Sequence, residues 1–172
     1  MQDRRMIRNV LFLCTGNSAR SILAEALLSR LGADRFRAYS AGSNPTGRVH
    51  PLALELLAAG GHPIGELRSK HWEEFAGPDA PELHFIFTVC DHAASESCPV
   101  WPGRPASAHW GIADPAAVAG DPARRRRAFE KAHAELTDRI GAFLRLDIER
   151  LSAQRLAAEL ARIGREGLVL PD

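Results

Sequence analysis

The chain has 172 residues, 45% hydrophobic and 25% charged, which suits one globular domain with a single core. Its 22 basic and 21 acidic residues give a net charge of +1, so charge gives no reason to expect nucleic acid or an anionic membrane as a partner. No apolar stretch approaches the roughly 20 residues needed to cross a bilayer, and the amino end lacks the features of a signal peptide. The three cysteines, an odd number, argue against a structural disulfide framework. A cytoplasmic protein is therefore expected.

Short apolar runs alternate with segments of helical periodicity along the chain. Four strands are expected, at residues 9–13, 36–42, 83–89 and 106–110. Four helices are expected, at residues 20–31, 51–61, 121–146 and 148–163. This alternation of strand and helix is typical of an α/β fold, in which helices cover both faces of a parallel sheet.

The first expected strand runs directly into the loop CTGNSAR, and a helix follows the loop. Ligands of such sheets bind at the carboxyl ends of the strands, which is where Cys14 falls. Backbone N–H groups of the loop, the positive end of the helix dipole and the forked guanidinium of Arg20 can together hold an oxyanion. The same field is expected to lower the pKa of Cys14 and make it a nucleophile, whereas the alternative is a cysteine that only fills the core. The expected oxyanion-binding residues are Thr15, Gly16, Asn17, Ser18, Ala19, Arg20 and Ser21.

Two further cysteines, Cys90 and Cys98, follow the third expected strand. Cys90 comes directly after the apolar run FIFTV, so parallel pairing brings it to the same sheet edge as Cys14. Cys98 lies eight residues further on, in a loop whose Gly and Pro content favours mobility over core packing. These placements favour thiol chemistry over the alternative of two buried or incidental cysteines.

The motif VLFLCTGNSARS resembles the Cys-x5-Arg-Ser loop of the low-molecular-weight protein tyrosine phosphatases, and is more similar still to the arsenate reductases built on that fold. The similarity continues through YSAGSNPTGRVHP, FTVCDHAASESCPVWPG and HWGIADPA, and covers roughly residues 9–145. It implies a single α/β domain with a four-stranded parallel sheet. A reductase domain is expected over residues 1–146, followed by a helical extension over residues 147–172 that packs on it or on a partner.

Resemblance to these reductases implies that arsenate is reduced to arsenite through a Cys14 thiol–arsenate adduct. Cys90 would resolve the adduct, and Cys98 would complete an intramolecular disulfide relay. No tightly bound cofactor is implied, but an external thiol reductant is required: thioredoxin, or else glutathione with glutaredoxin. The reductant stays open because one more residue separates Cys90 from Cys98 than in thioredoxin-linked members. Phosphate or sulfate would occupy the same loop.

The segment IADPA places Asp114 before a proline, as in the general-acid loop of the phosphatases, which implies that Asp114 protonates the leaving oxygen. A tyrosine typically follows this pair in the phosphatases, but here Ala116 follows, and Tyr39 is the chain's single tyrosine. A small inorganic oxyanion is therefore favoured over an aryl ester. The alternatives are a low-molecular-weight phosphatase that hydrolyses phosphate monoesters through a phosphocysteine, and a catalytically idle module that binds an oxyanion or a partner.

Asn17, Glu25 and Ser40 fall at positions that contribute to a potassium site in some of these reductases. No matching carboxylate after Gly61 is identified, so potassium near the loop is a hypothesis that depends on the resemblance. The seven histidines show no spacing with cysteine that is typical of a zinc site, and no other metal is expected. His109 and Trp110 are interpreted as packing residues around Asp114.

Overall fold

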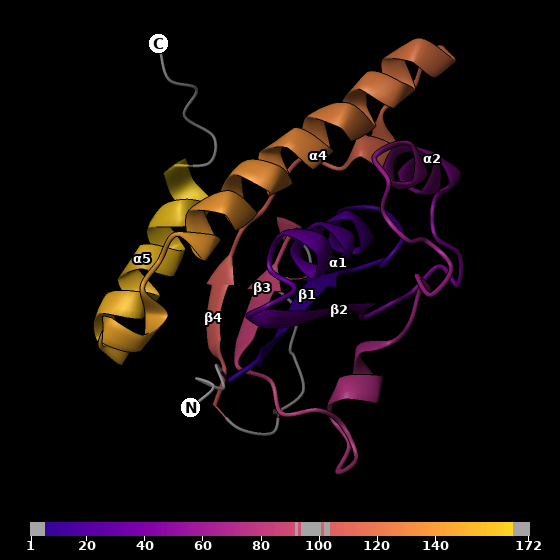
Figure 1. Ribbon diagram of the computed structural model, residues 1–172. Helices are drawn as coiled ribbons and strands as arrows, with labels where there is room; N and C mark the ends of the chain where they lie inside the picture. The colour runs from indigo at the N-terminus through magenta and orange to yellow at the C-terminus, as the bar shows by residue number, and fades with distance from the viewer. Residues whose placement is uncertain (1–5, 92, 94–100, 102–103, 167–172) are drawn as a thin grey trace.

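Four parallel strands form one sheet in the order β2-β1-β3-β4, which confirms the predicted sheet (Figure 1). The computed structural model describes residues 6–91, 93, 101 and 104–166. The strands are β1 (Arg8–Cys14), β2 (Phe36–Gly42), β3 (Phe85–Thr88) and β4 (Ala106–His109). The chain passes from β1 to β2 on one side and then crosses to β3 on the other side of β1. The strand order therefore reverses between β1 and β3, which is the point where ligands bind in open α/β sheets.

Helices and short 3-10 turns connect the strands. The α-helices are α1 (Arg20–Leu31), α2 (Pro51–Ala59), α4 (Pro122–Leu144) and α5 (Ala153–Glu166). The 3-10 helices are η1 (Trp72–Phe75), η2 (Pro115–Ala117) and η3 (Ile148–Arg150). Asp121 begins α4 as its N-cap by accepting the Arg124 N–H at 2.8 Å, and Pro122 follows at the first helical position, as its sequence predicts.

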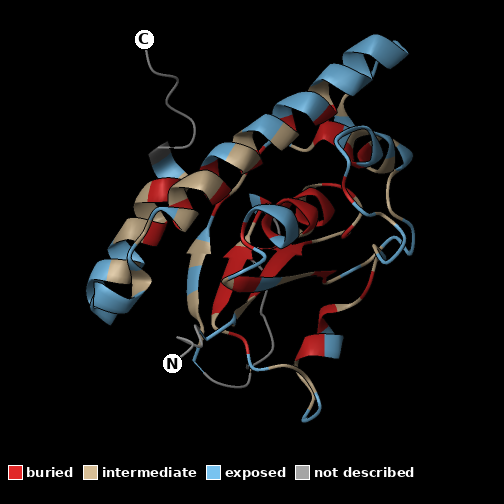
Figure 2. Cartoon of the chain, viewed as in Figure 1, coloured by how far each residue is buried: buried red, intermediate tan, exposed pale blue. Residues whose placement is uncertain are grey.

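The core has two layers because alternate residues of β1 point to opposite faces of the sheet. Val10 and Phe12 pack with the α-helices in the larger cluster, whereas Leu11 and Leu13 pack with η1 in the smaller one. Figure 2 shows β1, β3 and α1 as the most continuously buried part of the molecule. A strand buried on both faces explains the unbroken apolar run at residues 10–13.

The helix expected at residues 148–163 is interrupted. After η3 the backbone of Leu151 is extended, with ψ of 137°, and α5 begins only at Ala153. Ser152 accounts for the restart, because its hydroxyl accepts the Arg155 N–H at 3.1 Å as an N-cap side chain does. The apolar spacing alone did not reveal this break.

The described part of the C-terminal segment packs on β4 and α4 of the same chain. The Trp110 indole donates to the carbonyl of Leu160 at 3.0 Å, and both residues are fully buried. A Cβ at Gly164 would lie 2.3 Å from the carbonyl oxygen of His109, so only glycine allows the α5 backbone to approach β4 this closely. The division of the chain at residue 146 stays a prediction.

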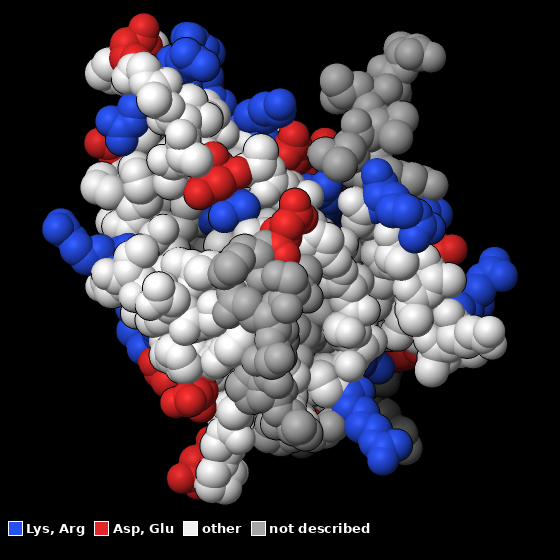
Figure 3. Space-filling model, turned by 180° about the vertical axis from the view of Figure 1, so that it is seen from behind, with Lys and Arg blue, Asp and Glu red and all other residues white. Residues whose placement is uncertain are grey.

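The surface carries both signs of charge. On the face shown in Figure 3, acidic and basic side chains are interspersed, in keeping with the net charge of +1. Among the residues that the structure describes, no helix combines the length and apolar character needed to cross a membrane.

Candidate active site

Asn17 fixes the shape of the loop between β1 and α1. Its φ of +45° is left-handed, a conformation that asparagine tolerates better than most residues. The side chain is fully buried and uses both ends: Nδ2 donates to Ser21 Oγ at 2.7 Å, and Oδ1 accepts the Lys70 N–H at 2.9 Å. Each buried polar atom of this amide therefore has a partner, which holds the left-handed turn in place.

Three carbonyls of the loop point outward and accept hydrogen bonds from the segment before α2. Asn44 N–H donates to Thr15, Thr46 N–H to Gly16 and His50 N–H to Ser18, at 2.9, 3.0 and 2.9 Å. A trans peptide directs its N–H opposite to its C=O, so the N–H groups that follow these carbonyls point into the loop. Converging N–H groups of this kind are suited to bind an anion.

Gly42, which the sequence analysis overlooked, lets the end of β2 press against this loop. A Cβ there would lie 2.4 Å from the carbonyl oxygen of Thr15 and 2.8 Å from that of Cys14. No side chain fits between these backbones, so β2 supports the loop directly. The only signal in the sequence is a glycine at the end of a strand, which also reads as an ordinary turn residue.

Cys14 and Cys90 lie together, as expected from their places at the ends of neighbouring strands. Both are free thiols, with 5% and 2% of their surface exposed, and they are hydrogen-bonded to each other. Cys90 Sγ also accepts the Ala93 N–H at 3.4 Å and lies 3.6 Å from Thr15 Oγ1. The topology thus places a second sulfur at the mouth of the oxyanion loop. Cys98 lies outside the described residues.

The shared hydrogen bond divides the two thiols into a donor and an acceptor. It lowers the pKa of Cys90 to about 5, with further help from the Ala93 N–H and Thr15. The same bond, together with burial, raises the pKa of Cys14, although Arg20 and the Gly16 N–H act in the opposite direction. The expected lowering for Cys14 is therefore not found in this arrangement. The field of the loop favours the Cys14 thiolate, but the second sulfur, which accepts a hydrogen bond from the first, outweighs it.

Arg20 joins the loop to the segment that carries Asp114. Its Nη1 donates to the carbonyl of Ile112 at 3.0 Å, and its Nη2 lies 3.6 Å from Asp114 Oδ2. The Asp114 carboxylate also accepts the Ala116 N–H at 3.0 Å, which begins η2. With 41% of its side chain exposed, Asp114 lies where solvent and a bound oxyanion can both reach it.

Arg139, on α4, supports the segment that leads to Asp114, a role that was not predicted from the sequence. It is 1% exposed, and its Nη2 donates to the carbonyl of Gly111 at 3.2 Å. Its Nε and Nη1 have no hydrogen-bond partner within the described part of the chain. The signal in the sequence is an arginine on the apolar stripe of α4, between Leu136 and Phe143.

His109 contacts the Cys90 side of the site, contrary to its interpretation as a residue that packs around Asp114. One ring nitrogen lies 2.8 Å from Thr88 Oγ1, and the other lies 2.7 Å from Asp91 Oδ1. Asp91 follows Cys90 directly, so this chain of contacts ties the start of the Cys90 segment to β4. Trp110 does pack: its ring stacks on Phe87 with centroids 3.8 Å apart.

The residues of the hypothetical potassium site also come together. Glu25 Oε1 accepts a hydrogen bond from the Ser40 hydroxyl at 3.2 Å. The buried Asn17 is linked to this pair by Lys70, whose backbone N–H donates to Asn17 Oδ1. The ammonium of Lys70 lies 3.8 Å from the same Glu25 oxygen. No local pattern in the sequence marks Lys70 as part of this group.

Residues 9–159 match the family described as low molecular weight phosphotyrosine protein phosphatase. The chain belongs to this family. Arsenate reductase of Bacillus licheniformis is 33% identical over 139 residues, which cover 79% of this chain and 94% of that protein. Arsenate reductase of Archaeoglobus fulgidus aligns in structure with a TM-score of 0.57 and 31% identity, over 77% of this chain and 98% of that chain. A thioredoxin-dependent arsenate reductase of Corynebacterium glutamicum aligns with a TM-score of 0.53 and 25% identity, over 76% of this chain and 58% of that chain.

Membership of this phosphatase family confirms the resemblance drawn from the Cys-x5-Arg loop, and the chain is an enzyme of that fold. The match extends past residue 145, where the recognisable motifs end, into the first half of α5.

Proposed function

We propose that this protein reduces arsenate to arsenite, with Cys14 as the nucleophile and Cys90 as the thiol that resolves the adduct. The observation that carries the proposal is the hydrogen bond between these two thiols at the oxyanion loop. Hydrolysis of a phosphate ester needs one thiol, whereas two-electron reduction of As(V) needs a second thiol within reach of the first. Relatives named arsenate reductase, at 33% and 31% identity, support this choice.

In the first step, the Cys14 sulfur bonds to arsenic and a hydroxyl leaves. The proton of Cys14 and this hydroxyl leave together as water, so arsenic stays As(V) in the adduct. Asp114 would carry the proton to the leaving oxygen, and Arg20 beside it would hold the oxyanion charge. The converging loop N–H groups would bind the remaining oxygens.

In the second step, Cys90 attacks the sulfur of Cys14. The sulfur–arsenic bond breaks with its electron pair moving to arsenic, which leaves as arsenite, and a Cys14–Cys90 disulfide forms. The contacts of Cys90 with the Ala93 N–H and with Thr15, which do not depend on the Cys14 proton, favour its thiolate at this step. Cys98 would then attack Cys90, which frees Cys14 and leaves a Cys90–Cys98 disulfide; this last role depends on the family resemblance.

An external thiol reductant must reduce the final disulfide, and no tightly bound cofactor takes part. We assign this step to thioredoxin because the Corynebacterium glutamicum relative is described as thioredoxin-dependent. Glutathione with glutaredoxin is the alternative. Because the thiols must start each cycle reduced, we place the protein in the cytoplasm.

Phosphate monoester hydrolysis is the second candidate, since Cys14, Arg20 and Asp114 are also what a phosphatase needs. Ala116, where the phosphatases typically have a tyrosine, argues against an aryl ester as the main substrate.

Cys90→Ser separates the two candidates. We expect it to lower arsenite formation by about 100-fold or more, because no second sulfur is left to take the electrons. The rate of para-nitrophenyl phosphate hydrolysis by this variant should equal that of the wild-type protein. Arsenite is measured directly, and NADPH consumption is followed with thioredoxin and thioredoxin reductase, then with glutathione and glutaredoxin.

Cys98→Ser is the matched control for loss of a thiol. It should still yield one arsenite per protein in a single turnover, because the first two steps do not use Cys98. Unchanged arsenite formation by Cys90→Ser would refute the relay and leave the phosphatase reading.

A further inference from the structure

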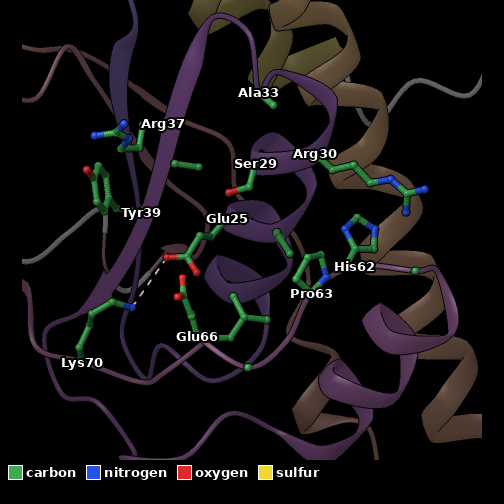
Figure 4. A pocket seen from close by; sticks show the side chains of 15 residues that line it. Glu25, Ser29, Arg30, Ala33, Arg37, Tyr39, His62, Pro63, Glu66 and Lys70 are labelled. Carbon is green, nitrogen blue, oxygen red and sulfur yellow. Dashed lines mark ion pairs between the residues drawn. The ribbon is translucent and has the colours of Figure 1, made fainter.

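A buried carboxylate and a buried ammonium lie side by side beneath the oxyanion loop. Figure 4 shows the Glu25 carboxylate in an open pocket of about 1130 Å³ beside α1, with its ion pair to Lys70 dashed. The two side chains are 12% and 7% exposed, and the charged atoms lie 3.8 Å apart. Lys70 Nζ also donates to the carbonyl of Arg68 at 2.8 Å, so the ammonium contacts oxygen atoms on two sides.

The backbone of Lys70 connects this pair to the loop. Its N–H donates to Asn17 Oδ1 at 2.9 Å, and its carbonyl accepts the Gly42 N–H at 2.9 Å. These are the two residues that set the left-handed turn and the close approach of β2 described above. A change in the position of Lys70 would therefore reach the N–H groups that face the oxyanion.

A potassium ion does not fit among these side chains as they stand. Each polar atom of the Asn17 amide already has a partner, the Lys70 N–H at Oδ1 and Ser21 at Nδ2. The Ser40 hydroxyl donates to Glu25, and the free side of that carboxylate oxygen faces the ammonium of Lys70. A second positive charge there would meet like-charge repulsion from the ammonium of Lys70.

We propose that Lys70 is a built-in cation: its ammonium takes the place beside Glu25 and Ser40 that a bound potassium ion would need, so that the oxyanion loop keeps its shape without a metal ion. The inference goes beyond the reductase proposal and does not depend on arsenate as the substrate.

The choice of residue supports this inference. Only two of the 22 basic residues are lysines, Lys70 and Lys131, and all the others are arginines. An ammonium is a compact point charge, as a monovalent ion is, whereas a guanidinium is a planar fork that needs more room. Burial raises the pKa of Glu25 and lowers that of Lys70, and each charge opposes the shift of the other, as expected for a mutually dependent pair.

Two substitutions test the inference in choline, lithium and potassium chloride at equal ionic strength. Lys70→Ala removes the cation, and Lys70→Asp replaces it with a carboxylate that can bind one. The readouts are the melting temperature and the dissociation constant of inorganic phosphate measured by calorimetry, neither of which requires arsenate reduction.

The wild-type protein should give the same values in all three salts. In choline, both variants should melt about 10 °C lower, because Glu25 loses its partner in a buried site. Their affinity for phosphate should fall about tenfold. Potassium should restore much of both losses, most of all in Lys70→Asp, and lithium should restore less. Lys131→Ala, which removes the exposed lysine, is the control and should match the wild type throughout.

Three results would overturn the inference. The first is a saturable rise in the melting temperature of the wild-type protein with potassium. The second is wild-type stability and phosphate affinity of Lys70→Ala in choline. The third is a Lys70→Asp variant that responds equally to lithium and potassium, or to neither. If both variants fail to fold, the wild-type titration alone decides, because a built-in cation leaves no site for potassium to fill.

Discussion

The two segments that bring sulfur to the active site are held by different kinds of contact. The loop after β1 is held on every side, by three outward carbonyls, the Asn17 amide and the close backbone of Gly42. The described residues after β3 make contacts of another kind: Cys90 accepts the Ala93 N–H and lies beside Thr15 through its sulfur, and the 96% exposed carboxylate of Asp91 is paired with His109. In the reduction that we propose, the loop after β1 holds the oxyanion while the Cys90 sulfur changes partner. Backbone contacts therefore suit the first segment, and replaceable sulfur contacts suit the second.

The strongest test of this comparison asks whether the fixed loop controls the charge of the second thiol. Cys14→Ala removes the hydrogen-bond donor, so the pKa of Cys90 should rise from about 5 toward its ordinary value. At pH 6 the thiolate fraction should then fall by about 100-fold or more. The rate of iodoacetamide alkylation as a function of pH, measured in a Cys98→Ser background, reports the change.

An unchanged profile of Cys90 in Cys14→Ala would show that the two thiols ionise independently. Cys14→Ser is the matched variant: its hydroxyl can still donate, so the pKa of Cys90 should stay closer to that of the wild type.

Loosening the fixed loop should have the next largest effect. Asn17→Ala removes both side-chain hydrogen bonds and leaves the Lys70 N–H buried without a partner, which costs about 2–3 kcal/mol of folding free energy. The affinity for phosphate should fall about 10- to 50-fold, because the left-handed turn loses its support. Urea unfolding and calorimetry measure the two effects.

Asn17→Asp is a useful companion, since its carboxylate can still accept the Lys70 N–H but can no longer donate to Ser21. It should lie between the wild type and Asn17→Ala in both measurements. If Asn17→Ala binds phosphate as tightly as the wild type, the loop is not held by this side chain.

The smallest effect is expected at the contact between His109 and Asp91, beside Cys90. His109→Ala removes the contact with Asp91 and should lower the rate of arsenite formation about threefold, since the start of the Cys90 segment loses one attachment at an exposed site. Hydrolysis of para-nitrophenyl phosphate, which does not use Cys90, should stay within error of the wild type. Equal losses in both assays would indicate instead that His109 supports the whole site.

The parts of the site that could be predicted from the sequence depend on strand order. Cys14 and Cys90 each follow an apolar run, and parallel pairing places the ends of neighbouring strands together, so their proximity follows without coordinates. Which of the two sulfurs is ionised could not be predicted from the sequence, because it depends on which thiol donates the hydrogen bond between them. Asn17, Arg20 and Asp114 also lie where the motifs predict.

The supporting residues could not be predicted because their partners are distant in the chain. Lys70 reaches Glu25 across 45 residues, and Arg139 reaches Gly111 across 28. Local pattern shows only a charged residue in a loop and an arginine on an apolar stripe. The break before α5 has a local signal, the N-cap residue Ser152. It was not predicted because the helical spacing of apolar residues continues on both sides of Ser152.

The close contact of α5 with β4 has a consequence for solubility. The N–H groups of residues 106 and 110 donate toward β3. The carbonyl of His109 belongs to the same peptide as the Trp110 N–H and points the opposite way, so it faces outward at the open edge of the sheet. Gly164 lies against that carbonyl, which means that the helix covers an edge where a strand from another molecule could otherwise pair. A chain cut short before residue 153 would therefore be expected to self-associate even though its catalytic loop is intact.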